Sequence, residues 1–122
     1  MSKLGRLSKG REFDQVYREG VAVSGPLLVL RCLRTEVSDP TAPAECAKWG
    51  FAVGKKLAKL SVDRNHARRR LRECARTYEI TPGTLLVITL RPAGLRAPYE
   101  SLRGGLGRAL STAGVLLPSP AP

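Results

Sequence analysis

Basic side chains crowd into one segment of the chain, residues 48–76, whose sequence is KWGFAVGKKLAKLSVDRNHARRRLRECAR. The segment holds ten of the 21 Lys and Arg residues and only two acids, Asp63 and Glu73, and so carries +8 of the formal net charge of +11. A charge block this dense inside a folded element is typical of a surface that binds a polyanion, and RNA or DNA is the commonest one. The chemistry that these residues indicate is therefore recognition of nucleic acid.

Within this segment, arginines recur at the period of a helix. The arginine row consists of Arg64, Arg68, Arg72 and Arg76, at i, i+4, i+8 and i+12, with Asn65 and Arg69 widening it. Guanidinium groups at this spacing can make forked, charge-assisted hydrogen bonds to phosphate oxygens along a strand. The alternative is a solvated charged face, but such a face normally mixes both signs of charge, and Glu73 is the only acid within the body of this helix.

Residues suited to breaking bonds are much harder to find. The single histidine, His66, lies inside the basic cluster, where positive neighbours disfavour its protonation, so contact with RNA or solvent is a simpler role for it than general-base catalysis. The chain has no D-x-D, H-E-x-x-H or G-x-S-x-G pattern. Cys32, Cys46 and Cys74 form no C-x-x-C pair and match no known zinc-ligand spacing with His66, so we expect free thiols and no metal site.

A second candidate site lies near the start of the chain. Phe13 and Tyr17 are one turn apart on the first expected helix, and they could stack on unpaired bases if they flank an open sheet face. The alternative is that both rings are ordinary core residues. Taken alone, the residues favour that alternative, because a chain with 5% aromatic residues has few rings to spare from its core.

The composition indicates one domain with a real core. The chain has 122 residues, 43% of them apolar, and a pI near 10.5, which attracts nucleic acid and also anionic membranes. No run approaches the ~20 apolar residues of a membrane span, and the opening MSKLGRLSKGREF lacks the apolar region of a signal peptide. These features predict a cytoplasmic protein, with one domain over residues 1–114 and a disordered tail over 115–122.

Hydrophobic periodicity and turn residues predict six elements in the order α-β-β-α-β-α. They are a helix from the cap Ser8 to about Glu19, an extended segment over 21–35 that is broken near Gly25-Pro26, a strand around Trp49, Phe51 and Val53, a helix with Asp63 as its N-cap, an apolar strand over 84–90, and a helix from about Pro98 to Ala113. Residues 36–47 form a Pro- and Ala-rich connecting loop. The strand, helix and strand between 48 and 90 predict a βαβ crossover in a small mixed sheet with the helices on one side, which makes the fold class α+β.

The basic segment resembles the signature of the protein subunit of bacterial ribonuclease P, whose family pattern is roughly G-[FI]-S-V-S-K-K-x-G-x-A-V-x-R-N-R-x-K-R-x-x-R-E. Two further stretches are similar to that family. The opening L-x-K-x-x-x-F-x-x-V-Y-R-x-G, from Leu7 to Gly20, resembles its first helix, and GTLLVITLRP with the helix that follows at Tyr99 resembles its ending. The resemblance covers about residues 4–113, and the combination is far more specific than R-N-R alone.

The sequence also departs from the family pattern. His66 stands at the third position of R-N-R, Ala58 stands at the glycine after K-K-x, and one extra residue lies between Lys56 and Arg64. In the second extended segment, Arg31 stands where the family usually has an aromatic residue, so the stacking role of that position is open.

The resemblance implies a single-domain α/β sandwich with an unusual left-handed βαβ crossover, and it implies two binding surfaces. Contact with the catalytic RNA falls by match on Lys55, Lys56, Arg64, Asn65, His66, Arg68, Arg69 and Arg72. Binding of the single-stranded 5′ leader of precursor tRNA, between the first helix and the sheet, falls on Phe13, Tyr17 and Arg31, which reverses the core interpretation of the two rings. No residue of the chain is expected to be catalytic or to hold a metal, because in this family the RNA performs the Mg²⁺-dependent hydrolysis.

These inferences predict an RNA-binding subunit of a ribonucleoprotein endoribonuclease, which helps ribonuclease P RNA to remove 5′ leaders from precursor tRNA without a membrane or an obligate protein partner. The chief alternative is a non-enzymatic ribosomal or assembly protein that binds ribosomal RNA, which shares the basic helix but does not explain the first-helix motif. A basic membrane-surface protein is disfavoured, because the arginine row has no neighbouring Trp/Phe/Leu insertion face. A protein-only nuclease is the least favoured class.

Overall fold

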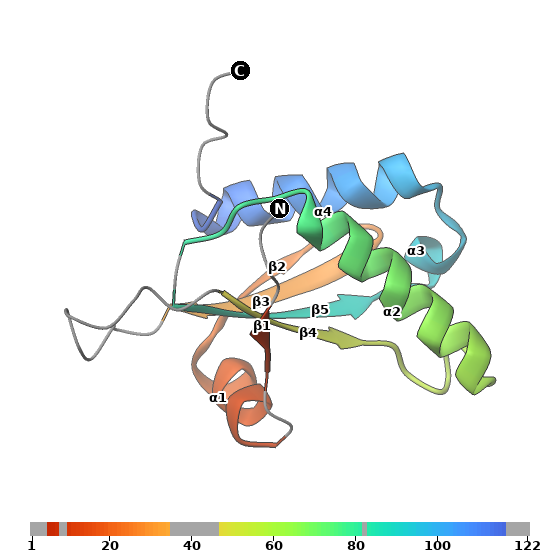
Figure 1. Cartoon of the computed structure of the whole chain (residues 1–122), viewed down its shortest axis with the longest axis horizontal. Helices are drawn as coiled ribbons and strands as arrows, with labels where there is room; N and C mark the ends of the chain where they lie inside the picture. Colours follow the sequence, from red (N-terminus) through yellow and green to blue (C-terminus); the bar gives the residue numbers. More distant parts are fainter. Residues whose placement is uncertain (1–4, 8–9, 35–46, 82, 117–122) are drawn as a thin grey trace.

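The computed structural model describes residues 5–7, 10–34, 47–81 and 83–116, and Figure 1 shows them as one sheet with helices on both of its faces. In chain order the elements are β1 (Gly5–Arg6), α1 (Arg11–Glu19), β2 (Val21–Ser24), β3 (Leu28–Arg34), β4 (Lys48–Ala52), α2 (Ser61–Arg76), β5 (Thr84–Leu90), α3 (Pro92–Arg96) and α4 (Tyr99–Ala113). The α+β class and the order of the long elements are confirmed. β1 and α3 were not predicted, because elements of two and five residues are too short to show a period.

The five strands lie in the order β1-β4-β5-β3-β2. β4 and β5 are parallel neighbours joined through α2, so the predicted βαβ crossover is confirmed. The left hand of this crossover stays an expectation from the resemblance. β3 pairs antiparallel with both β5 and β2, which makes the sheet mixed. β5 is the middle strand, and its sequence TLLVITL is almost wholly buried, as expected for a strand covered on both faces.

The sheet separates two hydrophobic clusters. The smaller cluster lies under α1 and consists of Leu7, Val16, Leu85 and Val87, with Phe13 and Leu33 packed against it. The larger cluster lies between the other face and the helices α2 and α4, and it includes Leu30, Leu71, Ile88, Leu106 and Leu110. β5 contributes to both, because successive side chains of a strand point to opposite faces. The expectation that the helices cover only one side of the sheet was therefore wrong.

Several predicted boundaries are also corrected. α2 begins at Ser61 with Leu60 as its N-cap, so Asp63 lies in the first turn, where its carboxylate complements the positive end of the helix. The extended segment 21–35 is a hairpin of β2 and β3, interrupted near Gly25-Pro26 as predicted. The first helix begins at Arg11, and its predicted cap, Ser8, lies outside the described residues.

The chain remains packed beyond α4. Val115 is only 1% exposed, and its carbonyl oxygen accepts hydrogen bonds from the N–H of Thr81 at 2.9 Å and from its hydroxyl at 3.1 Å. Leu116 forms an isolated β-bridge with Ile80. The first two residues assigned to a tail thus belong to the packed part of the chain. The rest of that predicted tail, residues 117–122, lies outside the described residues, as does the predicted loop up to residue 46.

Tyr78 joins α2 to α4. Its hydroxyl donates a hydrogen bond to the carbonyl oxygen of Arg103 at 2.7 Å, and the guanidinium carbon of Arg103 lies 5.4 Å from the centre of its ring. This ring position depends on a glycine at 107, because a Cβ there would come within 2.3 Å of the Tyr78 hydroxyl oxygen. Gly104, one turn earlier, is different: the nearest atom to an added Cβ is Nη1 of Arg108, at 3.9 Å.

These two glycines predict opposite effects of the same substitution within one helix. We expect Gly104→Ala to raise the free energy of unfolding by up to about 1 kcal/mol, because alanine has the higher helix propensity and its Cβ comes no closer than 3.9 Å to another group. We expect Gly107→Ala to lower it, because overpacking against Tyr78 costs about 1–3 kcal/mol. Urea unfolding of both variants measures the difference, and equal stability would contradict the packing described for Tyr78.

Candidate nucleic-acid interface

The outer surface of α2 is basic because the apolar residues of the helix face the interior, apart from the exposed Val62 in its first turn. The buried residues of this helix are Ala67, Leu71, Cys74 and Ala75. On its outer side, the exposed residues include Asn65, His66, Arg69, Arg72 and Arg76, while Arg64 and Arg68 are half-buried. The prediction of an apolar stripe with a separate arginine row is confirmed, and His66 lies on the outer side with the row.

Arg64 is partly occupied by the protein itself. Its Nη1 donates hydrogen bonds to the carbonyl oxygens of Ala58 at 3.0 Å and Lys59 at 2.9 Å, and its Nη2 donates to the hydroxyl of Ser61 at 3.2 Å. These bonds hold the connection between β4 and α2 against the first turn of the helix. Arg64 thus positions this loop in addition to any contact with RNA.

The two lysines predicted to join the arginine row lie in the connection that Arg64 holds. Lys55 and Lys56 occupy an exposed turn after β4, in which the N–H groups of Leu57 and Ala58 both donate to the carbonyl oxygen of Gly54 at 3.1 Å. Ala58, which stands at the family's glycine, is buried in the larger cluster. The structure therefore brings the K-K turn and the start of α2 together at one end of the helix, as Figure 1 shows.

The remaining arginines of the row differ in how much of their hydrogen-bonding capacity is free. Nη1 of Arg68 donates to Oδ1 of Asn65 at 3.2 Å, and Arg76 pairs with Glu73 at 3.3 Å. Arg69 and Arg72 are exposed, and within the described part of the chain their side chains form no hydrogen bond or ion pair. A phosphate could bind these two guanidinium groups without breaking a contact inside the protein.

Arg70 belongs to the same charge block but has a structural position that the sequence did not indicate. Its guanidinium donates hydrogen bonds to the carbonyl oxygens of Leu95, at 3.3 Å, and of Ala97. These carbonyls lie at the end of α3 and just after it, so Arg70 ties this connection to α2. The one available signal was its spacing, since Arg70 falls beside the apolar stripe on the side away from the arginine row.

The two aromatic residues of α1 have different surroundings. Phe13 is half-buried against the smaller cluster, and its ring lies on the backbone of β4, where a Cβ at Gly50 would come 2.3 Å from its Cζ. Tyr17 is 47% exposed. The core interpretation therefore describes Phe13 in part, whereas Tyr17 presents an open ring to solvent.

The sheet beside Tyr17 is open. By strand register, its α1 face continues past the helix with small and polar residues that are exposed or half-buried: Ala22, Ser24, Val29, Ala52 and Thr89. Arg31 lies on the same face, with its guanidinium carbon 4.9 Å from the centre of the Tyr17 ring and its Nη1 3.4 Å from the Thr89 hydroxyl, to which it donates. The structure thus brings Tyr17 and Arg31 together on an open sheet face, which is the condition under which a ring could stack on unpaired bases.

The buried thiols show no sign of reactivity. Cys32 and Cys74 are free and buried, and burial raises the pKa of both thiols above the usual value, which keeps them protonated and weakly nucleophilic. Cys46 lies outside the described residues. Among the residues that the structure describes, no three His, Cys, Asp or Glu side chains form a group that could hold a metal ion. None of the described helices is long and apolar enough to cross a membrane.

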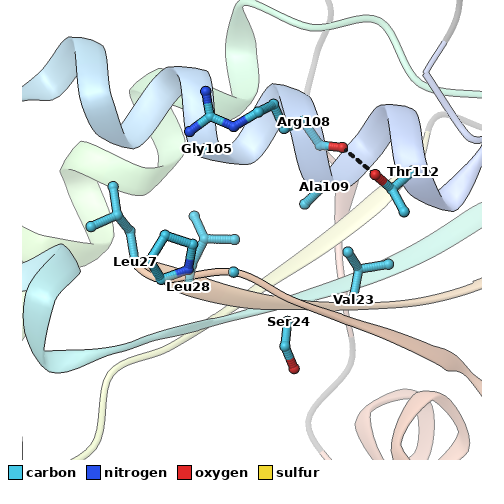
Figure 2. A pocket seen from close by; sticks show the side chains of 10 residues that line it. Val23, Ser24, Leu27, Leu28, Gly105, Arg108, Ala109 and Thr112 are labelled. Atoms are coloured by element: carbon cyan, nitrogen blue, oxygen red, sulfur yellow. Dashed lines mark hydrogen bonds between the residues drawn. The ribbon is translucent and has the colours of Figure 1, made fainter.

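A pocket of about 180 Å³ lies apart from both surfaces, between the β2–β3 hairpin and α4. Figure 2 shows Val23, Leu27 and Leu28 between the hairpin and the helix, while Ser24 points away from α4 toward the other face of the sheet. The lining is mostly apolar, and Arg108 and Thr112 add polar groups from α4. It shares no residue with the arginine row or with the pair of Tyr17 and Arg31.

Comparison with known proteins identifies relatives of the whole chain. A family model described as Ribonuclease P matches residues 1–114. The ribonuclease P protein component of Symbiobacterium thermophilum is 35% identical over 118 residues, which cover 95% of this chain and 96% of the relative. The corresponding protein of Gluconacetobacter diazotrophicus is 40% identical over 113 residues, which cover 90% of this chain and 91% of the relative.

Solved structures show the same fold. The ribonuclease P protein of Staphylococcus aureus superposes with a TM-score of 0.75 at 20% identity, covering 94% of this chain and 100% of that one. The protein from Thermotoga maritima superposes with a TM-score of 0.74 at 21% identity, covering 88% of this chain and 96% of that one. These likenesses support the arrangement of sheet and helices described above.

Proposed function

The chain belongs to the ribonuclease P protein family, and on that premise we propose that it binds the catalytic RNA through α2 and the 5′ leader of precursor tRNA through the sheet face beside Tyr17. The observation that carries this proposal is the placement of the two surfaces. α2 packs its apolar side on the larger cluster and leaves its basic side exposed, and α1 with Tyr17 packs over the smaller cluster on the opposite face of the sheet. Two RNA segments can therefore bind at the same time without competing for one surface.

The protein and the RNA have different tasks in this proposal. The RNA performs the Mg²⁺-dependent hydrolysis, as the family resemblance implies, and the residues of this chain only bind and position. Lys55, Lys56 and the exposed arginines of α2 offset the repulsion between catalytic RNA and substrate, which lowers the Mg²⁺ concentration that assembly requires. Only precursor tRNA carries a leader for the protein to contact, so these contacts favour binding of precursor over mature tRNA. The proposal includes a cytoplasmic location and no obligate protein partner.

Reconstitution tests the proposed function directly. We expect this protein, titrated into a bacterial ribonuclease P RNA at a low Mg²⁺ concentration where the RNA alone barely cleaves, to stimulate cleavage of a leader-bearing precursor tRNA at the mature 5′ end. The measurement is the initial rate of cleavage against protein concentration. RNA binding without stimulation would instead support the ribosomal or assembly type of RNA-binding protein.

The role of the arginine row predicts a change in salt dependence. We expect Arg68→Ala with Arg72→Ala to weaken binding to the catalytic RNA and to make the slope of log Kd against log salt shallower by about one to two units, because each lost phosphate contact removes released counterions. The matched control is Arg34→Ala with Arg108→Ala, which removes the same charge from exposed positions on β3 and α4. Equal slopes for the two double variants would assign the effect to net charge and remove α2 as the interface.

Tyr17 predicts an effect confined to substrates that carry a leader. We expect Tyr17→Ala to weaken binding of precursor tRNA to the assembled complex by about 1–3 kcal/mol, the value of one stacked base, and to leave the binding of leaderless tRNA unchanged. Tyr99→Ala is the control, because Tyr99 is similarly exposed, at 40%, but lies on α4. An equal loss for both substrates would show that Tyr17 only supports the fold. Phe13→Ala is a less clean test, since truncating a half-buried ring also lowers stability.

A further inference from the structure

Among the described side chains, Lys48 and Arg31 are the cations on the α1 face of the sheet, and they differ in their partners. Lys48 pairs with Glu12, with 3.2 Å between Nζ and Oε2, so its charge is balanced by α1. Arg31 forms no ion pair with any described residue, and its guanidinium contacts the ring of Tyr17 and the neutral hydroxyl of Thr89. A half-buried guanidinium without a counter-ion, on an otherwise uncharged stretch of open sheet, attracts an anion from solution.

The same contacts hold the guanidinium in place. The ring of Tyr17, 4.9 Å away, attracts the cation through its quadrupole, and the Thr89 hydroxyl accepts one of its N–H groups. A guanidinium has five N–H donors in a rigid fork, so one bond to Thr89 leaves others for a second acceptor. Because the group is already oriented, little side-chain freedom is lost when that acceptor binds.

We propose that Arg31 binds a phosphate of the leader backbone next to the nucleotide whose base stacks at Tyr17, so that leader recognition by this protein has an ionic component. This inference rests on the proposed function of the Tyr17 face. A phosphate is the group that every nucleotide of a single strand presents, whatever its base, which suits a site that must accept leaders of different sequence. An aromatic residue at position 31, as the family pattern has, would supply a stacking ring without charge.

The test measures how salt changes the benefit of having a leader. In the assembled complex with ribonuclease P RNA, the affinity for leader-bearing precursor is divided by the affinity for leaderless tRNA, which cancels the contacts that both substrates share. At constant divalent-ion concentration, one phosphate contact on a single strand gives this ratio a slope of about −0.7 against log salt, or about a 2.6-fold fall between about 100 and about 400 mM. We expect that slope for the wild type, no slope for Arg31→Gln and Arg31→Tyr, and a retained slope for Arg31→Lys.

The matched control is Arg34→Gln, which removes the same charge from an exposed position on β3 that alternation places on the other face of the sheet. We expect it to keep the wild-type slope. If the wild-type ratio exceeds one but does not change with salt, or if Arg31→Gln keeps the slope, the phosphate contact is overturned while leader binding stands. If the wild-type ratio equals one at every salt concentration, the proposed leader site itself fails. Thermal unfolding of each variant identifies any that no longer folds, and the slope for Arg31→Lys then decides whether charge is the cause.

Discussion

β5 forms backbone hydrogen bonds with β3 on one side and β4 on the other, and its side chains alternate between two hydrophobic clusters. This double burial is the constraint on which the rest of the molecule depends. A strand covered on both faces needs helices on both faces, so α1 must lie across the sheet from α2 and α4. The separation of the two surfaces that we propose bind RNA is thus a consequence of how the central strand is buried.

The positive charges on α2 repel one another, and backbone carbonyl groups of the protein compensate part of this repulsion. Arg64 donates to the loop before the helix and Arg70 to the connection after α3, so both guanidinium groups are bound by partial negative charge inside the protein. These bonds also fix two loops, the one before α2 and the connection between α3 and α4. The outer side retains Arg69 and Arg72, whose charge nothing in the described chain offsets. The same residue type therefore holds loops in place at two positions and forms an exposed basic surface at two others.

On the α1 face, too, one residue of a type supports the fold while a neighbour of similar type is exposed. Phe13 fills the space left by the missing side chain of Gly50, so it secures α1 to β4. Tyr17, one turn later, extends past the edge of the packed cluster and is covered on one side by Arg31. Tyr17 is 47% exposed, and the sheet face beside it carries the exposed or half-buried residues Ala22, Val29 and Thr89. Arg31 adds a positive charge to this face beside the Tyr17 ring.

The sequence by itself determined the elements with a clear period: the apolar strand 84–90, the basic helix with its buried stripe, and the last helix from Pro98. It also determined the family, because three separate stretches of the chain together match the family pattern. It could not determine that α1 lies opposite α2, since a strand such as β5, apolar at almost every position, has no periodicity to show which helix covers which face. Nor could it show that Arg70 is bound inside the protein while Arg72 is exposed, or that Phe13 is packed against β4 while Tyr17 is exposed. Those distinctions depend on which carbonyl, glycine or open sheet lies opposite each side chain, and only long-range packing places those partners there.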